Sequence, residues 1–362
     1  MSSASPMRRR WRLRSNPIIV KELRSRMRGG RAFILLTGFL AGLGVIGYGL
    51  FLRATSGERF GIPLFSAQIG QTLFAGLAFT VLFLVCLIAP AVTVGAISSE
   101  RERLTYEMLM ATSLPPRRVL WGKLISALSY VALLLLAAVP LGSIVFLFGG
   151  ITLRNVLQAA AIIIMTAIMT GLIGIWASAM TGRTGRAAVL AYLIIGLLLG
   201  GLLFSAEVWR TRSDQQVPLA LLAPNPVSAL ASSVAVLSGP SNNNPMMFEG
   251  AMMRDSMPMP GYGQFSTGLS FPGWQTFQIG VYPPVDPNAF GPNGMPIQPD
   301  PRPIWRTTLV IEVMVCLALF WMSLHAVRPR RRWRVGWGDL AMLSFSAVTL
   351  FGLGFWRGWW LR

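Results

Sequence analysis

Few side chains in this chain are arranged for catalysis or for nucleotide binding. The sequence has no GxxxxGK[ST] loop, which would hold phosphates, and no HExxH, CxxC or GxSxG motif. Its one histidine, His325, stands beside a basic run, and Cys86 and Cys316 lie inside apolar stretches. None of these supplies a nucleophile paired with a base, or a cluster of metal ligands. The sequence therefore predicts that the chain is not an enzyme and binds no ATP by itself.

A run of alternating charge opens residues 98–123, which read SSERERLTYEMLMATSLPPRRVLWGK. Apolar residues then recur at i, i+4 and i+7, which is typical of one face of an amphipathic helix. Pro115 and Pro116 would end that helix. Such a helix could transmit force from a soluble partner, whereas a solvated charge run that only fixes topology is the alternative. The candidate contact residues are Glu100, Glu102, Leu104, Glu107, Met108 and Ala111.

Glu312 is the one acidic residue inside an apolar stretch of full span length. A carboxyl group in such a stretch is costly and points to a function when it is retained. Glu312 could reach water at the near end of its stretch, pair with Arg306, or contact a transported substrate. It is the candidate substrate contact of the chain.

Six methionines gather in a proline-rich part of the chain. Exported segments of this kind can bind Cu(I) through soft thioether ligands. The simpler interpretation is a loop that happens to be rich in methionine, because the segment has no His or Cys and Met also serves as adaptable apolar filler. No metal site is predicted, and a copper site is kept as the weaker alternative. The residues are Met246, Met247, Met252, Met253, Met257 and Met259.

Long apolar stretches surround these candidates. Only 12% of the residues are charged and 53% are hydrophobic, which excludes an ordinary soluble enzyme. A bilayer crossing needs roughly 20 apolar residues, so we expect an all-α, polytopic transmembrane helical bundle with six spans. Residues 339–356 are a candidate seventh that could cross, lie in the interface or re-enter. The six stretches are 32–52, 73–97, 124–148, 156–180, 187–206 and 308–326.

The basic residues predict the orientation of these spans. The chain has 32 Lys and Arg against 13 Asp and Glu, and 22 of the basic residues fall on one side of the predicted membrane. Positive residues mark the cytoplasmic side, so the amino terminus is predicted to be cytoplasmic. Lys123 is expected to anchor its helix at that interface. Because the topology explains the net charge of +19, no nucleic-acid partner is predicted.

The chain thus divides into five predicted segments. Residues 1–31 form a basic cytoplasmic segment, and 32–206 hold the first five spans with the cytoplasmic loop 98–123. An extracytoplasmic Pro- and Met-rich loop, 207–307, precedes the sixth span at 308–326, and 327–362 hold a basic run and the candidate seventh span. Asn16 and Pro17 suit the start of an amphipathic helix on the inner leaflet, a lipid-contacting element that includes Lys21, Glu22 and Arg24.

Two glycine pairs and two prolines are expected to shape the spans. Gly38 with Gly42, and Gly196 with Gly200, have the spacing that lets helix backbones approach each other. Pro90 and Pro140 lie inside the second and third stretches, where each removes a helical hydrogen bond and should bend the helix.

Three local motifs resemble elements of one family. The run Glu100-Arg101-Glu102-Arg103, the proline turn and Trp121-Gly122-Lys123-Leu124 look like the coupling-helix loop of type-2 ABC (ATP-binding-cassette) transporter permeases. Leu104 stands where that family usually has Gly, and Pro115 where it usually has Ser. Residues 16–28 resemble the family's interfacial helix. Asn225-Pro226-Val227-Ser228-Ala229-Leu230 is similar to its Asn-Pro-Phe-Ser-Ala-Leu-like element.

The resemblance implies a function that composition does not provide. It implies the permease subunit of an exporter in the plasma or inner membrane, paired with a second copy or a related permease. A separate ATP-binding subunit would bind the ATP and push on the coupling helix at 100–112. The alternative is a non-transporting membrane scaffold whose basic face docks a cytoplasmic partner or anionic lipid.

Overall fold

The computed structural model describes residues 30–55, 66–106, 116–212, 218–235 and 304–327, together with Ser344 and Ala347. Six helical stretches within them are long and apolar enough to cross a membrane, as predicted. The described part of the chain is therefore an all-α, polytopic bundle. Apart from two positions, the candidate seventh span lies outside the described residues. The six stretches are Phe33–Leu52, Ile69–Glu102, Arg118–Phe148, Leu153–Met180, Thr184–Trp209 and Ile304–Val327.

Three of the spans are built from more than one helical element, and the third span of the chain, α6, ends in a 3-10 turn, η2. The second runs through α3 and α4, which separate at Val94, four residues after Pro90. The fifth runs through α8 and α9, joined by a π-helical turn, η3. A π-helical turn shifts the backbone hydrogen bonds by one residue and often marks a functional site. The helices of the spans are α2 (Gly30–Thr55), α3 (Ser66–Thr93), α4 (Gly95–Glu102), α6 (Pro116–Ile144) with the 3-10 turn η2 (Val145–Phe148), α7 (Leu153–Met180), α8 (Thr184–Gly196), η3 (Leu197–Gly201), α9 (Leu202–Arg212) and α14 (Ile304–Val327).

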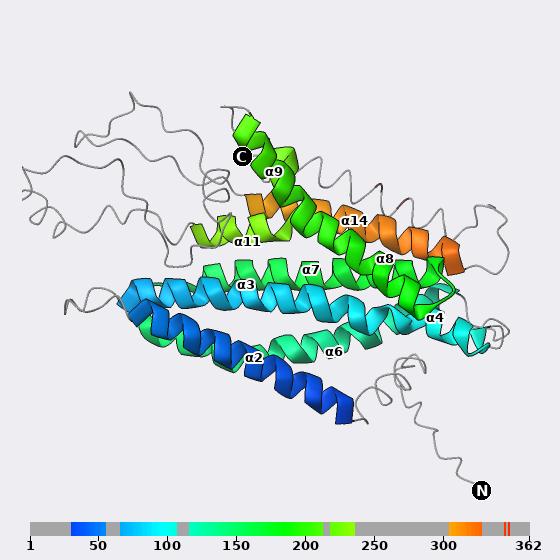
Figure 1. The fold of residues 1–362 in the computed structure, drawn as a ribbon, viewed down its shortest axis with the longest axis horizontal. Helices are drawn as coiled ribbons and strands as arrows, with labels where there is room; N and C mark the ends of the chain where they lie inside the picture. The colour runs from blue at the N-terminus through cyan, green and yellow to red at the C-terminus, as the bar shows by residue number, and fades with distance from the viewer. Residues whose placement is uncertain are drawn as a thin grey trace, which may run out of the picture.

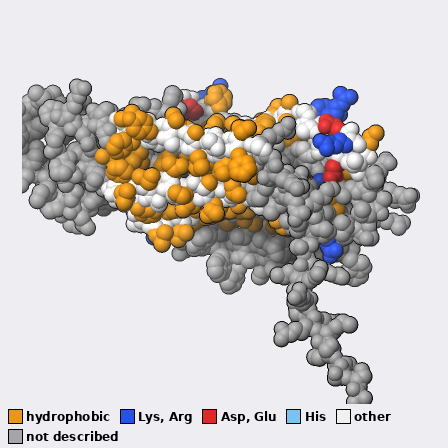
Figure 2. Space-filling view, turned by 90° about the horizontal axis from the view of Figure 1, so that it is seen from below, with side chains coloured by type: hydrophobic (Ala, Val, Ile, Leu, Met, Phe, Trp, Pro, Cys, Tyr) orange, Lys and Arg blue, Asp and Glu red, His pale blue; other side chains and the backbone are white. Residues whose placement is uncertain are grey.

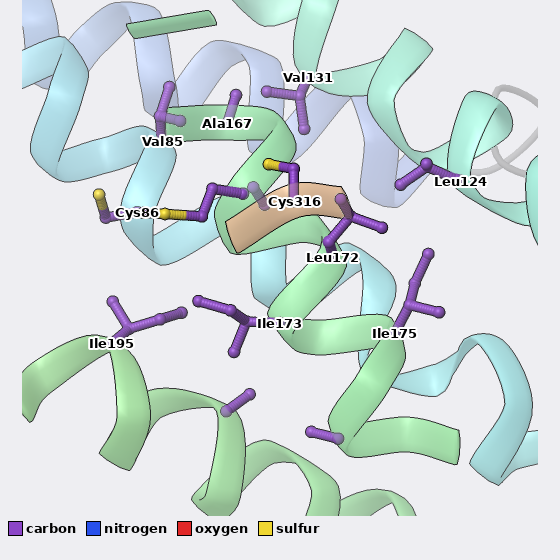
Figure 3. Close-up of a cluster of buried hydrophobic side chains, with 14 of the residues drawn as sticks. Val85, Cys86, Leu124, Val131, Ala167, Leu172, Ile173, Ile175, Ile195 and Cys316 are labelled. Carbon is purple, nitrogen blue, oxygen red and sulfur yellow. The ribbon is translucent and has the colours of Figure 1, made fainter. Parts of the chain in front are cut away.

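Helix α7 lies at the centre of the bundle, between α3 and α14 (Figure 1). More than half of its most apolar window is buried, against 11% for α2, which lies at the edge beside α3 and α6. The core side chains come from α3, α4, α6, α7, α8, α11 and α14, and Figure 3 shows Cys86, Ile173 and Cys316 among them. Because α7 contacts most of the other helices, a displacement of its ends would also displace several spans.

The outer surface of the bundle suits contact with lipid. Phe33, Ile34 and Val45 of α2 are each at least two-thirds exposed, although they are large and apolar. Figure 2 shows hydrophobic side chains over most of one described face, with the largest cluster of basic and acidic side chains at one end. A soluble protein rarely exposes so continuous an apolar surface.

Close helix approaches occur at glycines other than those expected. A Cβ built on Gly38, Gly42, Gly196 or Gly200 would meet nothing within 4 Å, so these residues do not pack the described helices together. Instead, a Cβ on Gly174 of α7 would lie 2.0 Å from Thr93 Oγ1 on α3. The predicted close packing at these glycine pairs is therefore wrong within the described chain. The four-residue spacing places two glycines on one face of a helix but does not specify whether another helix packs against that face.

A short helix, α11 (Pro226–Ala235), is buried inside the bundle. It follows a single turn, α10 (Leu219–Leu222), and packs on α14, α7 and α3. Both elements belong to the segment expected to be an external loop, and α11 is too short to cross a bilayer, at about 15 Å. The sixth span also begins earlier than expected, at Ile304. Part of the predicted loop is therefore part of the packed helical core.

Candidate functional site

The charged run identified from sequence lies where several helices meet, as α4, α7 and α14 finish and α6 and α8 begin. We call this region the α4 end of the bundle. Helix α4 carries Glu100, Arg101 and Glu102 in its last turn. Each of these three side chains contacts a different part of the bundle.

Glu100 forms an ion pair with Lys123 of α6, with 2.7 Å between Glu100 Oε1 and Lys123 Nζ. The lysine side chain is only 4% exposed and that of the glutamate 26%. A buried ammonium group is costly unless a carboxylate and hydrogen bonds compensate it. Lys123 is therefore packed inside the α4 end, where Glu100 provides the opposite charge, and its role as an anchor at the membrane interface stays a prediction.

Arg101 binds the carboxyl ends of two helices. Its Nη1 donates to the carbonyl of Ala179 in the last turn of α7 at 2.9 Å, and its Nη2 donates to that of Ala326 in α14 at 3.4 Å. The last carbonyls of a helix have no partner within the helix and carry partial negative charge. A guanidinium group with several fixed donors suits two such ends at once. Arg101 thus holds the ends of α7 and α14 level with each other.

Tyr106, just beyond α4, adds to the same contact. The guanidinium of Arg101 lies 4.9 Å from the centre of the Tyr106 ring, a cation-π distance. The Tyr106 hydroxyl also donates to the carbonyl of Val327, the last residue of α14. The chain leaving α4 is therefore fixed to α14 as well.

Glu102 caps the amino end of α8. Its Oε1 accepts from the Thr184 backbone N–H at 2.7 Å, and its Oε2 accepts from the Thr184 hydroxyl at 2.9 Å. The residue at the usual capping position, Arg183, makes no side-chain cap. A carboxylate favours a helix amino end because the free N–H groups there are partly positive. A side chain 82 residues away thus replaces the local cap.

Ser178 of α7 supports the start of α4. Its hydroxyl oxygen accepts from the backbone N–H groups of Ile97 and Ser98 at 3.0 and 2.9 Å. These donors lie in the first turn of α4, where no helical partner exists. The break at Val94 therefore leaves no unsatisfied donors at these two positions, and α4 is joined to α7 at both of its ends.

Leu104 departs from the helix in which it was expected. It follows the end of α4 with φ at 57°, and its side chain is 85% exposed. Left-handed backbone is strained for a residue with a Cβ. The continuous helix expected over 100–112 is therefore wrong, because α4 ends at Glu102 and Leu104 lies in a turn. Glu107, Met108 and Ala111 lie outside the described residues.

The other predicted site residues fall into two groups. Glu312 is described and is fully buried: its Oε1 lies 2.9 Å from the Thr166 hydroxyl on α7, so it does not reach water. The remaining candidates lie outside the described residues and remain predictions. They are Asn16, Pro17, Lys21, Glu22 and Arg24 of the interfacial helix and Met246, Met247, Met252, Met253, Met257 and Met259.

The motif beginning at Asn225 forms the start of α11. The Asn225 side-chain oxygen accepts from Val227 N at 2.9 Å, and Pro226 is the first helical residue, as its sequence predicts. The Asn225 Nδ2 group donates to the Leu199 carbonyl in η3, also at 2.9 Å. Asn225 is fully buried, so the same side chain caps α11 and fixes it to the π-helical turn.

Sequence reasoning missed the partners at the α4 end. Ser178 and Thr184 are ordinary small polar residues in sequence, and their roles depend on contacts about 80 residues away. The one available signal was the change from apolar to polar residues at the ends of the spans. Among the described residues, no group of three or more His, Cys, Asp or Glu could hold a metal ion.

Comparison with protein-family models and with curated proteins finds no match to this chain. The class of the protein is therefore assigned from its fold alone. It is a multi-pass integral membrane protein.

Proposed function

We propose that the chain is the membrane-spanning permease subunit of an ATP-driven ABC transporter, an exporter of the plasma or inner membrane. It would work as a pair with a second copy or a related permease. Separate ATP-binding subunits would lie below the α4 end, which is then the cytoplasmic end.

The observation that carries this proposal is the set of contacts made by the last turn of α4. Glu100 contacts α6, Arg101 contacts α7 and α14, and Glu102 contacts α8. Coupling between distant sites needs physically connected elements. A force applied to the loop after α4 would reach four further helices through these side chains, as transport driven from outside the membrane requires.

The backbone at Leu104 also supports the proposal. The permeases that this loop resembles usually have Gly at that position, and glycine adopts left-handed backbone without strain. The φ of 57° at Leu104 gives a physical reason for that preference. Leu104 therefore differs from the family's usual glycine in residue type, but its backbone adopts the left-handed conformation that glycine favours.

The proposal is tested by pairing the chain with the ATP-binding-cassette subunit encoded nearest to it. We expect the two to purify together, and ATP hydrolysis by the complex in nanodiscs to exceed that of the isolated ATPase. Arg101→Gln should weaken this stimulation because α7 and α14 lose their shared contact. Arg103→Gln is the matched control, since Arg103 is exposed and adjacent.

Two results would contradict the proposal. One is failure of the subunits to associate although both are folded. The other is binding of anionic vesicles or of a cytoplasmic protein without any effect on ATP hydrolysis, which would favour a membrane scaffold.

A further inference from the structure

We propose that Glu312 is a cation site in the middle of the bundle, where the carboxyl group exchanges its proton for a cationic group of the transported molecule. This inference rests on the proposed transport function and names a substrate class for it: amphipathic, monovalent organic cations. Its basis is a layer of buried polar groups contributed by α7, α14, η3 and the start of α11.

The depth of Glu312 follows from the level helix ends that Arg101 holds. Glu312 precedes Val327 by fifteen residues and Thr166 precedes Met180 by fourteen, so both lie about 21 to 23 Å from the α4 end. These positions are near the middle of α7 and well inside α14. Glu312 thus lies deep between the helices, because α14 extends beyond the apolar stretch seen in sequence.

Helix α11 begins at the same depth. Asn225 donates to the Leu199 carbonyl, and Leu199 follows Thr184 by fifteen residues, again about 22 Å from the α4 end. Farther along α11, Ser232 accepts from Trp305 N in the first turn of α14, about 33 Å from the α4 end. Helix α11 therefore runs from the middle of the bundle to its opposite end. Discontinuous helices that start at mid-depth are typical of transport sites.

The hydrogen bonds around Glu312 indicate its protonation state. The Thr166 hydroxyl has one proton but lies 2.9 Å from two acceptors, Glu312 Oε1 and the Ile162 carbonyl. If Glu312 were a carboxylate, one of these short contacts would lack a proton. A neutral carboxyl group can donate to Thr166, which then donates to Ile162, and both contacts are satisfied. The geometry therefore fits a protonated Glu312.

Among the described residues, no cation compensates Glu312. The titratable groups of this part of the chain that interact with it electrostatically are the thiols of Cys86 on α3 and Cys316 on α14. The charged residues of α7, α6 and α14 lie toward the helix ends, as Arg154, Lys123 and Arg306 do, and α11 has no charged residue. An ionised carboxylate here would cost several kcal/mol. A mobile cation could supply the missing charge.

The exchange step is a proton transfer followed by ion pairing. The O–H bond of Glu312 breaks and its proton passes to water when α11 and α14 move apart from α7. The carboxylate then pairs with the entering cation. Its Oε2 is free for this contact, since it has no hydrogen-bond partner among the described residues although it is buried. No charge is left uncompensated in either state.

Proton release on cation binding tests the proposal. The full chain in nanodiscs, in weak buffer with a pH-sensitive dye, is titrated with ethidium, a fluorescent monovalent organic cation. We expect about one proton released for each ethidium bound, and about tenfold weaker binding without proton release in Glu312→Gln. Glutamine keeps the shape of the side chain and can donate to Thr166, so this variant should fold. Glu207→Gln in α9 is the matched control. It should bind ethidium and release protons as the unchanged chain does.

Ethidium binding by the unchanged chain without proton release would overturn the exchange. Equal binding by Glu312→Gln and the unchanged chain would overturn the site, as would no binding by either. The measurement needs neither ATP nor an ATP-binding subunit. A failure of the transporter proposal would appear instead in the absence of subunit association, and the two failures are therefore distinguishable.

Discussion

The α4 end and the middle of the bundle both contain glutamates that contact other helices, but the two regions compensate these side chains in opposite ways. At the α4 end, Glu100 has a lysine and Glu102 has the amino end of a helix. In the middle, Glu312 contacts the Thr166 hydroxyl, and no described residue provides it with a cation. The first arrangement fixes helices to one another. The second leaves a buried acid without a described ionic partner. Under the proposed exchange at Glu312, rigidity and chemistry would lie at different depths of the bundle.

The largest expected effect comes from breaking the ion pair at the α4 end. Glu100→Gln leaves the buried Lys123 ammonium without its carboxylate and should lower the free energy of unfolding by about 3 kcal/mol. Unfolding in mixed micelles with increasing SDS measures this. The double variant Glu100→Gln with Lys123→Met should recover most of the loss, because it removes both charges. An unchanged stability in the single variant would contradict the role given to this pair.

A smaller effect of opposite sign is expected at the turn after α4. Leu104→Gly should raise the free energy of unfolding by about 1 kcal/mol, because glycine removes the strain of left-handed backbone. Its side chain is 85% exposed, so little packing is lost. Thr105→Gly is the control and should give no gain, since Thr105 is not among the residues with positive φ. A loss of stability in Leu104→Gly would show that the leucine side chain has a packing role.

The cap on α8 should contribute less than the ion pair. Glu102→Gln keeps one acceptor for Thr184 but removes the negative charge from the helix amino end. We expect a small fall in the thermal midpoint, which disappears at high salt because Glu102 is exposed and its charge is screened. Arg103→Gln serves as the control. A fall that persists in high salt would assign the effect to hydrogen-bond geometry.

The spans could be predicted because each signal is local. Apolar length identified all six, and the Asn225-Pro226 pair identified the start of a helix. Burial of α11 could not be predicted, since it depends on packing against α14, α7 and α3, and a helix that carries Ser228, Ser232 and Ser233 could equally face water. Their hydroxyls are satisfied by carbonyls of the same turn, as the bond from Ser232 to Ala229 illustrates, and this makes burial inexpensive.

The contacts of the α4 end depend on long-range geometry. Lys123 and Glu100 are 23 residues apart on different helices, so the positive-inside pattern placed the lysine at the interface without indicating its partner. The turn at Leu104 was missed because leucine rarely adopts positive φ, and helical spacing was the stronger local signal. Sequence thus located the charged loop but could not specify which side chains fix it to the bundle.

The smallest expected effect distinguishes the two kinds of glutamate most directly. Glu312→Gln replaces a neutral acid with a neutral amide of the same shape, and the amide can donate to Thr166 while Thr166 donates to Ile162. The free energy of unfolding should therefore change by less than about 0.5 kcal/mol, in contrast to Glu100→Gln. If Glu312 were ionised, the same substitution would remove an uncompensated buried charge and stabilise the bundle clearly. SDS unfolding of both glutamine variants under the same conditions measures this difference, and a marked gain in stability for Glu312→Gln would contradict the protonated state.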